Sequence, residues 1–211
     1  MPGVIAVRSV LLFGGSFDPI HHGHLIIGRH AAEHLGVERV VLVPSASPPH
    51  KQSHNLSPAA DRLDMCRLAV GDDPQFEVSD WEVGQPGPNY TLLTVQHFRQ
   101  TCGDATALHW LIGMDSLAEL GTWYHAAELV DACTIVTAAR PGSEPPSAAF
   151  LGRWFSPAQI ERLYRHILEG PRIDISARDI RARVRAGRSI RHLVPEPVRQ
   201  YLLGHGLYRG E

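Results

Sequence analysis

The sequence predicts an α/β fold in which a doubly wound, mostly parallel sheet carries helices on both faces. Two observations lead to this prediction. Short apolar runs alternate with helix-like segments along most of the 211 residues. The runs at 10–13 and 39–44 are continuous rather than alternating, which is typical of strands buried on both faces. Alternation of the two kinds of segment favours parallel strands joined by helices.

The expected elements follow one another in a regular order. We expect strands at 10–13, 39–44, 76–80, 107–113, 133–139 and 172–175. We expect helices from about residue 23, at 58–70 and 91–102, one or two short ones within 117–129, and further helices at 157–168, 177–187 and 196–204. Residues 141–156 are rich in Pro, Ser and Ala and should form a surface loop. The chain should be one domain over 1–211, with a core at about 8–140 and a small helical C-terminal portion at about 157–211.

The composition limits the classes of function. A formal charge of −2 gives no bulk attraction to polymeric nucleic acid. The short N-terminal apolar stretch is interrupted by Arg8, so we expect no signal peptide, no membrane span and no membrane partner. Cys66, Cys102 and Cys133 are scattered and odd in number, which indicates free thiols in a reducing, cytoplasmic compartment.

The most informative stretch is GGSFDPIHHGHL at 14–25, directly after the first expected strand. Its glycines should let the backbone turn sharply and approach a ligand closely. The following helix begins with unpaired N–H groups that favour an anion. His21 and His24 lie at the start of that helix, where imidazole N–H groups can stabilise charge on a phosphate. The stretch therefore predicts chemistry on a nucleotide phosphate.

Other interpretations of this stretch fit less well. The dinucleotide pattern G-x-G-x-x-G is absent, and no Gly-Lys-Ser/Thr follows as in a P-loop. A zinc site built from His21, His22 and His24 would lack a cysteine or carboxylate at ligand spacing nearby. We therefore expect no protein-held metal.

Further polar residues should gather at the same edge of the sheet. In an open α/β sheet, ligands bind beyond the carboxyl ends of the strands. Lys51, Asp115 and Arg140 each follow an expected strand. Asp115 at this place could bind a ribose hydroxyl or cap a helix. The segment ISARDIR at 175–181 adds a second helix start, with Ser176 as its predicted N-cap.

The pattern G-x-F-D-P-x-H-x-G-H resembles the signature of the nucleotidylyltransferase superfamily, over nearly the whole chain from about residue 10 to 209. The resemblance implies a Rossmann-like fold in which His21 and His24 contact a nucleoside triphosphate. ISARDIR resembles the second signature, an Ile-Ser followed by Arg, which makes Arg181 the third catalytic candidate. Arg178 departs from the small hydroxyl residue that the family often has there. The residues then expected to bind ATP are Gly14, Gly15, Ser16, Phe17, Asp115, Arg140 and Ser176.

The resemblance is closest to the nicotinate-nucleotide adenylyltransferase branch. In that branch a tryptophan matching Trp123 stacks on the pyridine ring, and backbone N–H groups of residues matching Thr91 and Tyr124 bind the nicotinate carboxylate. The loop with Lys51 would hold the phosphate side of the mononucleotide. The implied reaction transfers the adenylyl group of ATP to nicotinate mononucleotide, with Mg²⁺ held mostly by the substrate and water.

Three alternatives remain open at this stage. The acceptor could be nicotinamide mononucleotide, phosphopantetheine or a glycerol phosphate. The chain could be a non-catalytic nucleotide sensor, or a metal-binding protein built on its histidines. The sequence leaves the oligomeric state open, a homo-oligomer included.

Overall fold

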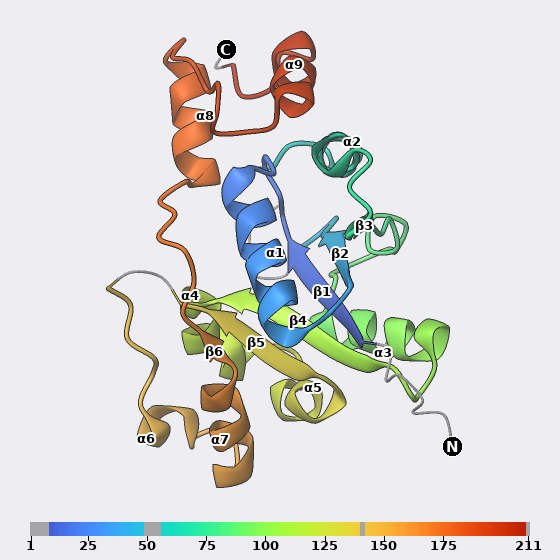
Figure 1. Ribbon diagram of the computed structural model, residues 1–211, viewed down its shortest axis with the longest axis vertical. Helices are drawn as coiled ribbons and strands as arrows, with labels where there is room; N and C mark the ends of the chain where they lie inside the picture. Colours follow the sequence, from blue (N-terminus) through green and yellow to red (C-terminus); the bar gives the residue numbers. More distant parts are fainter. Residues whose placement is uncertain (1–8, 49–55, 140–141, 210–211) are drawn as a thin grey trace.

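A computed structural model describes residues 9–48, 56–139 and 142–209. Its strands form one parallel sheet in the order β3-β2-β1-β4-β5-β6 (Figure 1). The strands are β1 (Ser9–Gly15), β2 (Arg39–Pro44), β3 (Phe76–Val78), β4 (Ala107–Gly113), β5 (Thr134–Ala138) and β6 (Ile167–Leu168). The predicted α/β class with a parallel sheet is confirmed.

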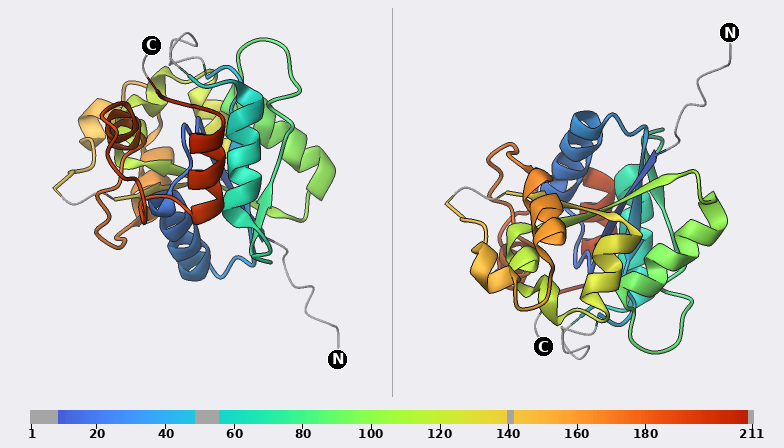
Figure 2. Two further views of the ribbon diagram at one scale, coloured as in Figure 1. Left: turned by 90° about the horizontal axis from the view of Figure 1, so that it is seen from above. Right: turned by 90° about the horizontal axis from the view of Figure 1, so that it is seen from below.

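Helices cover both faces of the sheet (Figures 1 and 2). One face carries α1 (His22–Leu35), α2 (Ala59–Val70), α8 (Ala177–Arg185) and α9 (Glu196–Gly204). The other carries α3 (Thr91–Cys102), α4 (Met114–Glu119), the 3₁₀ turn η2 (Leu120–Thr122), α5 (Ala126–Ala132), α6 (Ala148–Leu151) and α7 (Pro157–Arg165). No helix in the described ranges is long and apolar enough to cross a membrane.

The strands are apolar on both sides because each side meets a separate core. Val10 and Leu12 of β1 pack into the cluster under α3, α4, α5 and α7, whereas Leu11 between them packs under α1 and α2. All three side chains are at most 2% exposed. The continuous apolar runs therefore reflect two-sided burial.

The last strand lies earlier in the chain than the sequence predicts. Residues 172–175 form no strand, and the helix expected at 157–168 ends at Arg165. Ile167 and Leu168 pair with β5 instead. The apolar alternation at 172–175 has another cause, because Ile175 packs against the core beneath α1. Here the alternating pattern reflects one side of an extended segment packing on the core, although the segment pairs with no strand.

The segment expected to be a surface loop at 141–156 contains a short helix and buried side chains within its described part, 142–156. Ser147 caps the short helix α6 by accepting a hydrogen bond from the Phe150 N–H. Leu151 and Phe155 are buried in the core, and Trp154 lies against Gly121. The Pro, Ser and Ala content of the segment favoured a loop prediction, so the burial of these apolar side chains was not expected.

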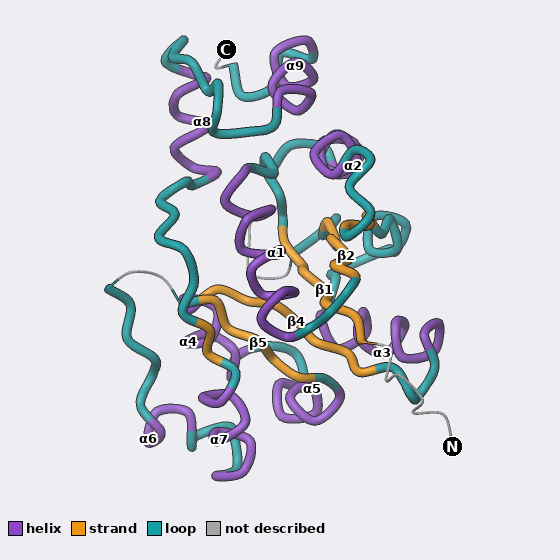
Figure 3. The backbone as a smooth tube through the Cα atoms, in the orientation of Figure 1, coloured by secondary structure: helices purple, strands orange, loops and turns teal. Residues whose placement is uncertain are grey.

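The C-terminal helices α8 and α9 pack on the same face of the sheet as α1 and α2. Ser176 caps α8 as predicted, accepting from the Asp179 N–H, and Ile180 and Val184 are buried beneath it. Helix α9 packs along α2, as Figure 2 shows from above. The tube in Figure 3 shows the long loop that carries the chain from β6 up to α8. Tyr208, which follows α9, thereby lies against Asp18 in the turn before α1.

The strand order reverses between β1 and β4. β1 pairs with β2 on one side and with β4 on the other. At such a switch point the connections leave in opposite directions and open a crevice at the carboxyl ends. Gly14 and Gly15 end β1 at this place.

We expect Gly14→Ala to lower the free energy of unfolding by about 1–3 kcal/mol, because a Cβ there would overlap the Trp110 ring. Urea unfolding measures the change. Gly204→Ala is the matched control: Gly204 lies in α9 with open space around it, so alanine should be neutral or slightly stabilising. Equal effects of the two substitutions would contradict this account of Gly14.

Candidate active site

The chain turns sharply between β1 and α1, and Phe17 makes that turn. We expected the glycines to turn there, but both lie in β1, with Gly14 paired to Val43. Phe17 takes a left-handed φ of 45°, and the Asp18–Pro19 peptide bond that follows is cis. The Phe17 ring folds back so that a Cβ on Gly15 would lie 3.1 Å from it. The glycines therefore provide room for neighbouring rings.

The two histidines of the motif lie together at the start of α1. Their rings stack with centroids 3.7 Å apart. The His24 and Phe17 rings lie nearly perpendicular to each other, with their centroids 5.1 Å apart. A Cβ at Gly23 would lie 3.0 Å from the His21 ring, so glycine leaves room for the stacked rings. The structure thus brings the two predicted catalytic histidines into contact.

Backbone geometry determines which nitrogen of His24 can donate. The His21 N–H donates to His24 Nδ1 at 3.2 Å. A neutral imidazole that accepts at Nδ1 carries its proton on Nε2. His24 can therefore offer an N–H donor from Nε2. His21 is 5% exposed, so its ring has little contact with solvent.

Arg181 reaches this loop from α8, across 163 positions of sequence. Its Nη1 donates to the Asp18 carbonyl oxygen at 2.6 Å and lies 3.9 Å from Asp18 Oδ2. The side chain remains 26% exposed. The structure therefore places the third predicted catalytic residue beside the histidine loop, with its side chain partly exposed.

A buried arginine that the sequence analysis missed joins the neighbouring loops. Arg62 of α2 is 1% exposed. Its guanidinium donates to the carbonyl oxygens of Ser16 at 2.7 Å, Ser45 at 2.6 Å, Ala46 at 3.2 Å and Ser57 at 2.9 Å. Burial lowers the pKa of Arg62, and the nearby carboxylate of Asp18 opposes that shift. One side chain thus connects the exits of β1 and β2 to the start of α2.

A cavity of about 230 Å³ opens at the switch point. Six of the predicted binding residues line it: Gly14, Gly15, Ser16, Thr91, Trp123 and Tyr124. The residues that the sequence analysis did not single out include Ser45, Glu82, Asn89, Tyr90, Trp110, Ser116 and Glu119. The residues predicted for ATP and those predicted for the mononucleotide therefore meet at the end of β1.

The wall of this cavity is held by a buried polar network. Asn89 Oδ1 accepts from the Ser47 N–H at 2.7 Å and from the Ser45 hydroxyl at 3.2 Å. Its amide nitrogen donates to the Glu82 carbonyl at 3.0 Å. Glu82 Oε1 accepts from the Thr94 hydroxyl at 2.6 Å. Asn89 directly precedes Tyr90 and Thr91, and its hydrogen bonds hold the loop after β2 close to the start of α3.

Aromatic rings also line the cavity. Trp123 is half-buried and packs against the core. Tyr124 is 43% exposed and stacks on Tyr90, with ring centroids 4.4 Å apart. Flat faces of this kind suit a planar heteroaromatic ring.

The remaining predicted residues differ in how far the structure places them. Asp115 lies exposed in the first turn of α4, and Gly113 rather than Asp115 is the N-cap. Neither Asp115 nor Ser176 lines the cavity, although Ser176 begins the helix that carries Arg181. Lys51 and Arg140 lie outside the described residues.

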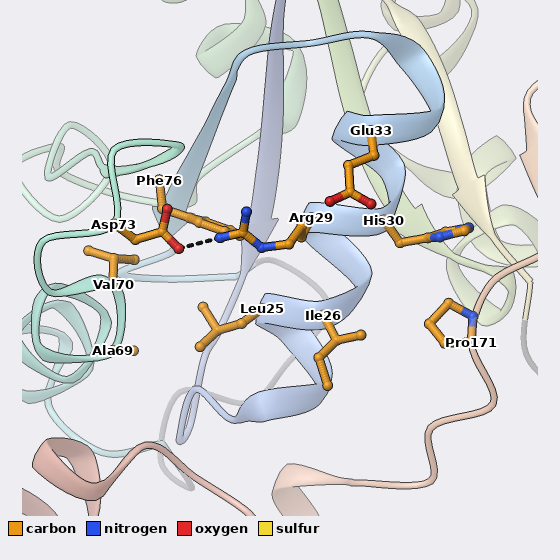
Figure 4. Close-up of a pocket in the computed structure, with 10 residues that line it drawn as sticks. All are labelled: Leu25, Ile26, Arg29, His30, Glu33, Ala69, Val70, Asp73, Phe76 and Pro171. Carbon is orange, nitrogen blue, oxygen red and sulfur yellow. Dashed lines mark hydrogen bonds and ion pairs between the residues drawn. The ribbon is translucent and has the colours of Figure 1, made fainter.

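A larger hollow, of about 630 Å³, lies between α1 and α2 (Figure 4). Arg29 crosses it and forms an ion pair with Asp73. Leu25, Ile26 and Phe76 line it, and none of the predicted site residues does. We therefore assign the site to the smaller cavity and the histidine loop.

No group of three His, Cys, Asp or Glu side chains that could hold a metal occurs within the described parts of the chain. Burial raises the pKa of the Cys133 thiol to about 12 and also raises that of Cys66. These two thiols are therefore poor metal ligands and poor nucleophiles.

The parallel sheet with a histidine loop at its switch point is the arrangement of a Rossmann-like nucleotidylyltransferase. The cytidylyltransferase-like family model matches residues 12–183. A relative from Roseiflexus sp. is 41% identical over 94% of this chain and 96% of its own length. One from Dehalococcoides mccartyi is 36% identical over 97% and 98%. Both carry the name "Probable nicotinate-nucleotide adenylyltransferase". The chain belongs to the cytidylyltransferase-like family and, within it, to the nicotinate-nucleotide adenylyltransferases.

Solved structures agree in fold. A Plasmodium falciparum nicotinic acid mononucleotide adenylyltransferase complexed with NaAD superposes with a TM-score of 0.72, over 95% of this chain and 97% of that one. The same protein complexed with APC gives 0.73. The identities are 13% and 14%, so these likenesses concern the fold.

We expect the stability contribution of Glu82 to depend on pH. Burial raises the pKa of Glu82, so the folded state binds its proton more tightly than the unfolded chain does. The free energy of unfolding should then fall as pH rises above the ordinary glutamate value of 4.5. Glu82→Gln keeps the acceptor for Thr94 but removes the titration, so its advantage over the wild type should grow from about pH 4 to about pH 8. Parallel stability curves in urea would contradict this.

Proposed function

We propose that this protein transfers the adenylyl group of ATP to the 5′-phosphate of nicotinate mononucleotide, giving nicotinate adenine dinucleotide and pyrophosphate. The observation that carries the proposal is the stacked pair of His21 and His24 at the start of α1, next to a cavity that begins at Gly14 and Gly15. Membership in the nicotinate-nucleotide adenylyltransferases supports the choice of acceptor.

The chemistry requires orientation and charge stabilisation more than a strong base. A phosphate oxygen of the mononucleotide attacks the α-phosphorus of ATP. The bond from that phosphorus to the bridging oxygen breaks, and pyrophosphate leaves with the electron pair. The nucleophile is already an anion, so no proton has to be removed from it. Donors aimed at the oxygens where negative charge grows lower the barrier.

The histidine loop would supply these donors. His24 offers its Nε2–H to the α- and β-phosphate oxygens, because Nδ1 is occupied by the His21 N–H. His21 would act on the same oxygens from the stacked position. The dipole of α1 adds a favourable field for the triphosphate at this end, where the His22 N–H itself donates to the Leu193 carbonyl.

The outer phosphates would be bound from α8. Arg181 can present its partly exposed side chain to the β/γ end, and Ser176 begins the same helix. Ser16 and Phe17 would lie along the nucleotide, Asp115 would bind a ribose hydroxyl, and Arg140 would lie near the adenine or the phosphates.

The pyridine nucleotide would occupy the cavity at the switch point. Trp123 would stack on the ring, and the backbone N–H groups of Thr91 and Tyr124 would bind the carboxylate. An amide group in place of the carboxylate offers N–H donors where an acceptor is needed, so the cavity favours the acid. Lys51 would bind the phosphate side.

Magnesium would travel with ATP. A Mg²⁺ ion held by triphosphate oxygens and water needs few protein ligands. When bound it neutralises charge on the leaving pyrophosphate. The free thiols fit a reducing cytoplasm as the place of action.

A pyrophosphate-release assay with ATP tests the proposed reaction. Nicotinate mononucleotide should be used at least about tenfold more efficiently, in kcat/KM, than nicotinamide mononucleotide. Phosphopantetheine serves as the unrelated acceptor. Equal use of the two pyridine nucleotides would contradict the carboxylate assignment, and ATP binding without pyrophosphate release would favour a non-catalytic sensor.

His24→Ala should lower kcat by about 10²–10³ while the fold survives, in line with the loss of one preorganised donor. Steady-state kinetics and circular dichroism measure the two effects. His34→Ala is the matched control, since His34 is exposed at the far end of α1. Normal turnover by the His24 variant would refute its catalytic role.

A further inference from the structure

We propose that Tyr208 is a positioning residue of the ATP site: its hydroxyl saturates the buried carboxylate of Asp18 and so leaves the Arg181 guanidinium available for phosphate. This inference rests on the proposed function, in which Arg181 binds the triphosphate. It assigns a role to the end of the chain, to which the sequence analysis gave only packing.

The contact is direct and partly buried. The Tyr208 hydroxyl donates to Asp18 Oδ1 at 2.5 Å, across 190 positions of sequence. Asp18 is 1% exposed, so its carboxylate depends on protein donors. Tyr208 itself holds a left-handed φ of 63°, which a residue with a bulky side chain rarely adopts. The surrounding structure therefore maintains an unfavourable backbone conformation where the hydroxyl reaches Asp18.

The phenol remains a donor at neutral pH. Burial raises the pKa of Tyr208, and the Asp18 carboxylate raises it further. A protonated phenol beside an acid group is a fixed donor, and hydrogen bonds to charged acceptors are the stronger kind.

The second carboxylate oxygen of Asp18, Oδ2, has weaker hydrogen-bond donors. Oδ2 accepts from the Ser57 N–H at 3.4 Å, a long bond. Arg181 Nη1 lies 3.9 Å from the same oxygen, while that nitrogen donates to the Asp18 carbonyl. The ion pair between Arg181 and the carboxylate is thus close but incomplete.

Removal of the phenol would upset this balance. A buried carboxylate that loses a donor recruits the nearest cation, because leaving the charge unsatisfied is costly. Of the two described arginines beside Asp18, Arg62 already donates to four carbonyl oxygens, whereas the Arg181 side chain is 26% exposed and can shift toward the carboxylate. A closer Arg181–Asp18 pair would draw the guanidinium away from the phosphates.

The test is Tyr208→Phe, which deletes one hydroxyl. We expect the Kd for ATP, measured by calorimetry, and the KM for ATP to rise about 10- to 150-fold, the range for one hydrogen bond to a charged group. The KM for nicotinate mononucleotide should change by less than about twofold, because its cavity does not include Arg181.

Tyr201→Phe is the matched control. The Tyr201 hydroxyl also donates to a carboxylate, Asp61 Oδ1 at 2.8 Å, and also ties the C-terminal segment to the body of the protein. That carboxylate lies on α2 and does not contact Arg181. The control should also lower Tm, by less because Asp61 is only partly buried, and should keep the ATP constants of the wild type. Equal losses of ATP affinity in both variants would overturn the proposal, because they would reflect a loosened C-terminal segment.

A double-mutant cycle tests whether the effect passes through Arg181. In an Arg181→Ala background, Tyr208→Phe should change the Kd for ATP by less than about twofold. Independent effects that multiply would overturn the proposal, as would normal ATP binding by Tyr208→Phe. Failure of the proposed function would appear in the wild-type protein, as the absence of adenylyl transfer to the mononucleotide, and the ATP affinities would still test Tyr208.

Discussion

The guanidinium of Arg62 is the interaction on which the site depends. A charged group that is 1% exposed survives only if its donors are satisfied, and here four carbonyl oxygens from three segments do so. Those segments follow β1, follow β2 and precede α2. Their relative positions are set by one planar group with fixed donor directions, a task for which lysine is poorly suited. The nearby Asp18 carboxylate compensates the buried charge.

Asp18 extends this order from the loops to the C-terminal helices. Its carbonyl receives Arg181 and its carboxylate receives Tyr208, so α8 and the end of the chain both fasten to the turn before α1. The cavity is lined by Gly14, Gly15 and Ser16, which directly precede the same turn. Two proposed substrate subsites thus share one short stretch of backbone, as the transfer of a group from one bound nucleotide to another requires.

Local sequence predicted several elements accurately. The strands at 39–44 and 107–113 and the helix at 91–102 have the bounds that the apolar patterns indicate. Such patterns succeed where burial on a sheet face is the dominant force. The strand expected at 172–175 fails because Ile175 is buried by side-chain packing without a paired strand. A pattern of burial does not tell which backbone will satisfy the hydrogen bonds.

The sequence by itself determined the fold class, the histidine pair and the second helix start with Ser176 and Arg181, because these follow from short-range spacing. A lone arginine one turn before Cys66, on the apolar side of α2, was the available signal for Arg62, but its partners are carbonyl groups that no side-chain pattern reveals. Only the tertiary structure decided which distant groups meet: Arg62 with three loops, and Tyr208 with Asp18 across 190 positions. The reason is physical, since a buried charge is satisfied by whatever polar groups the packed backbone brings within reach.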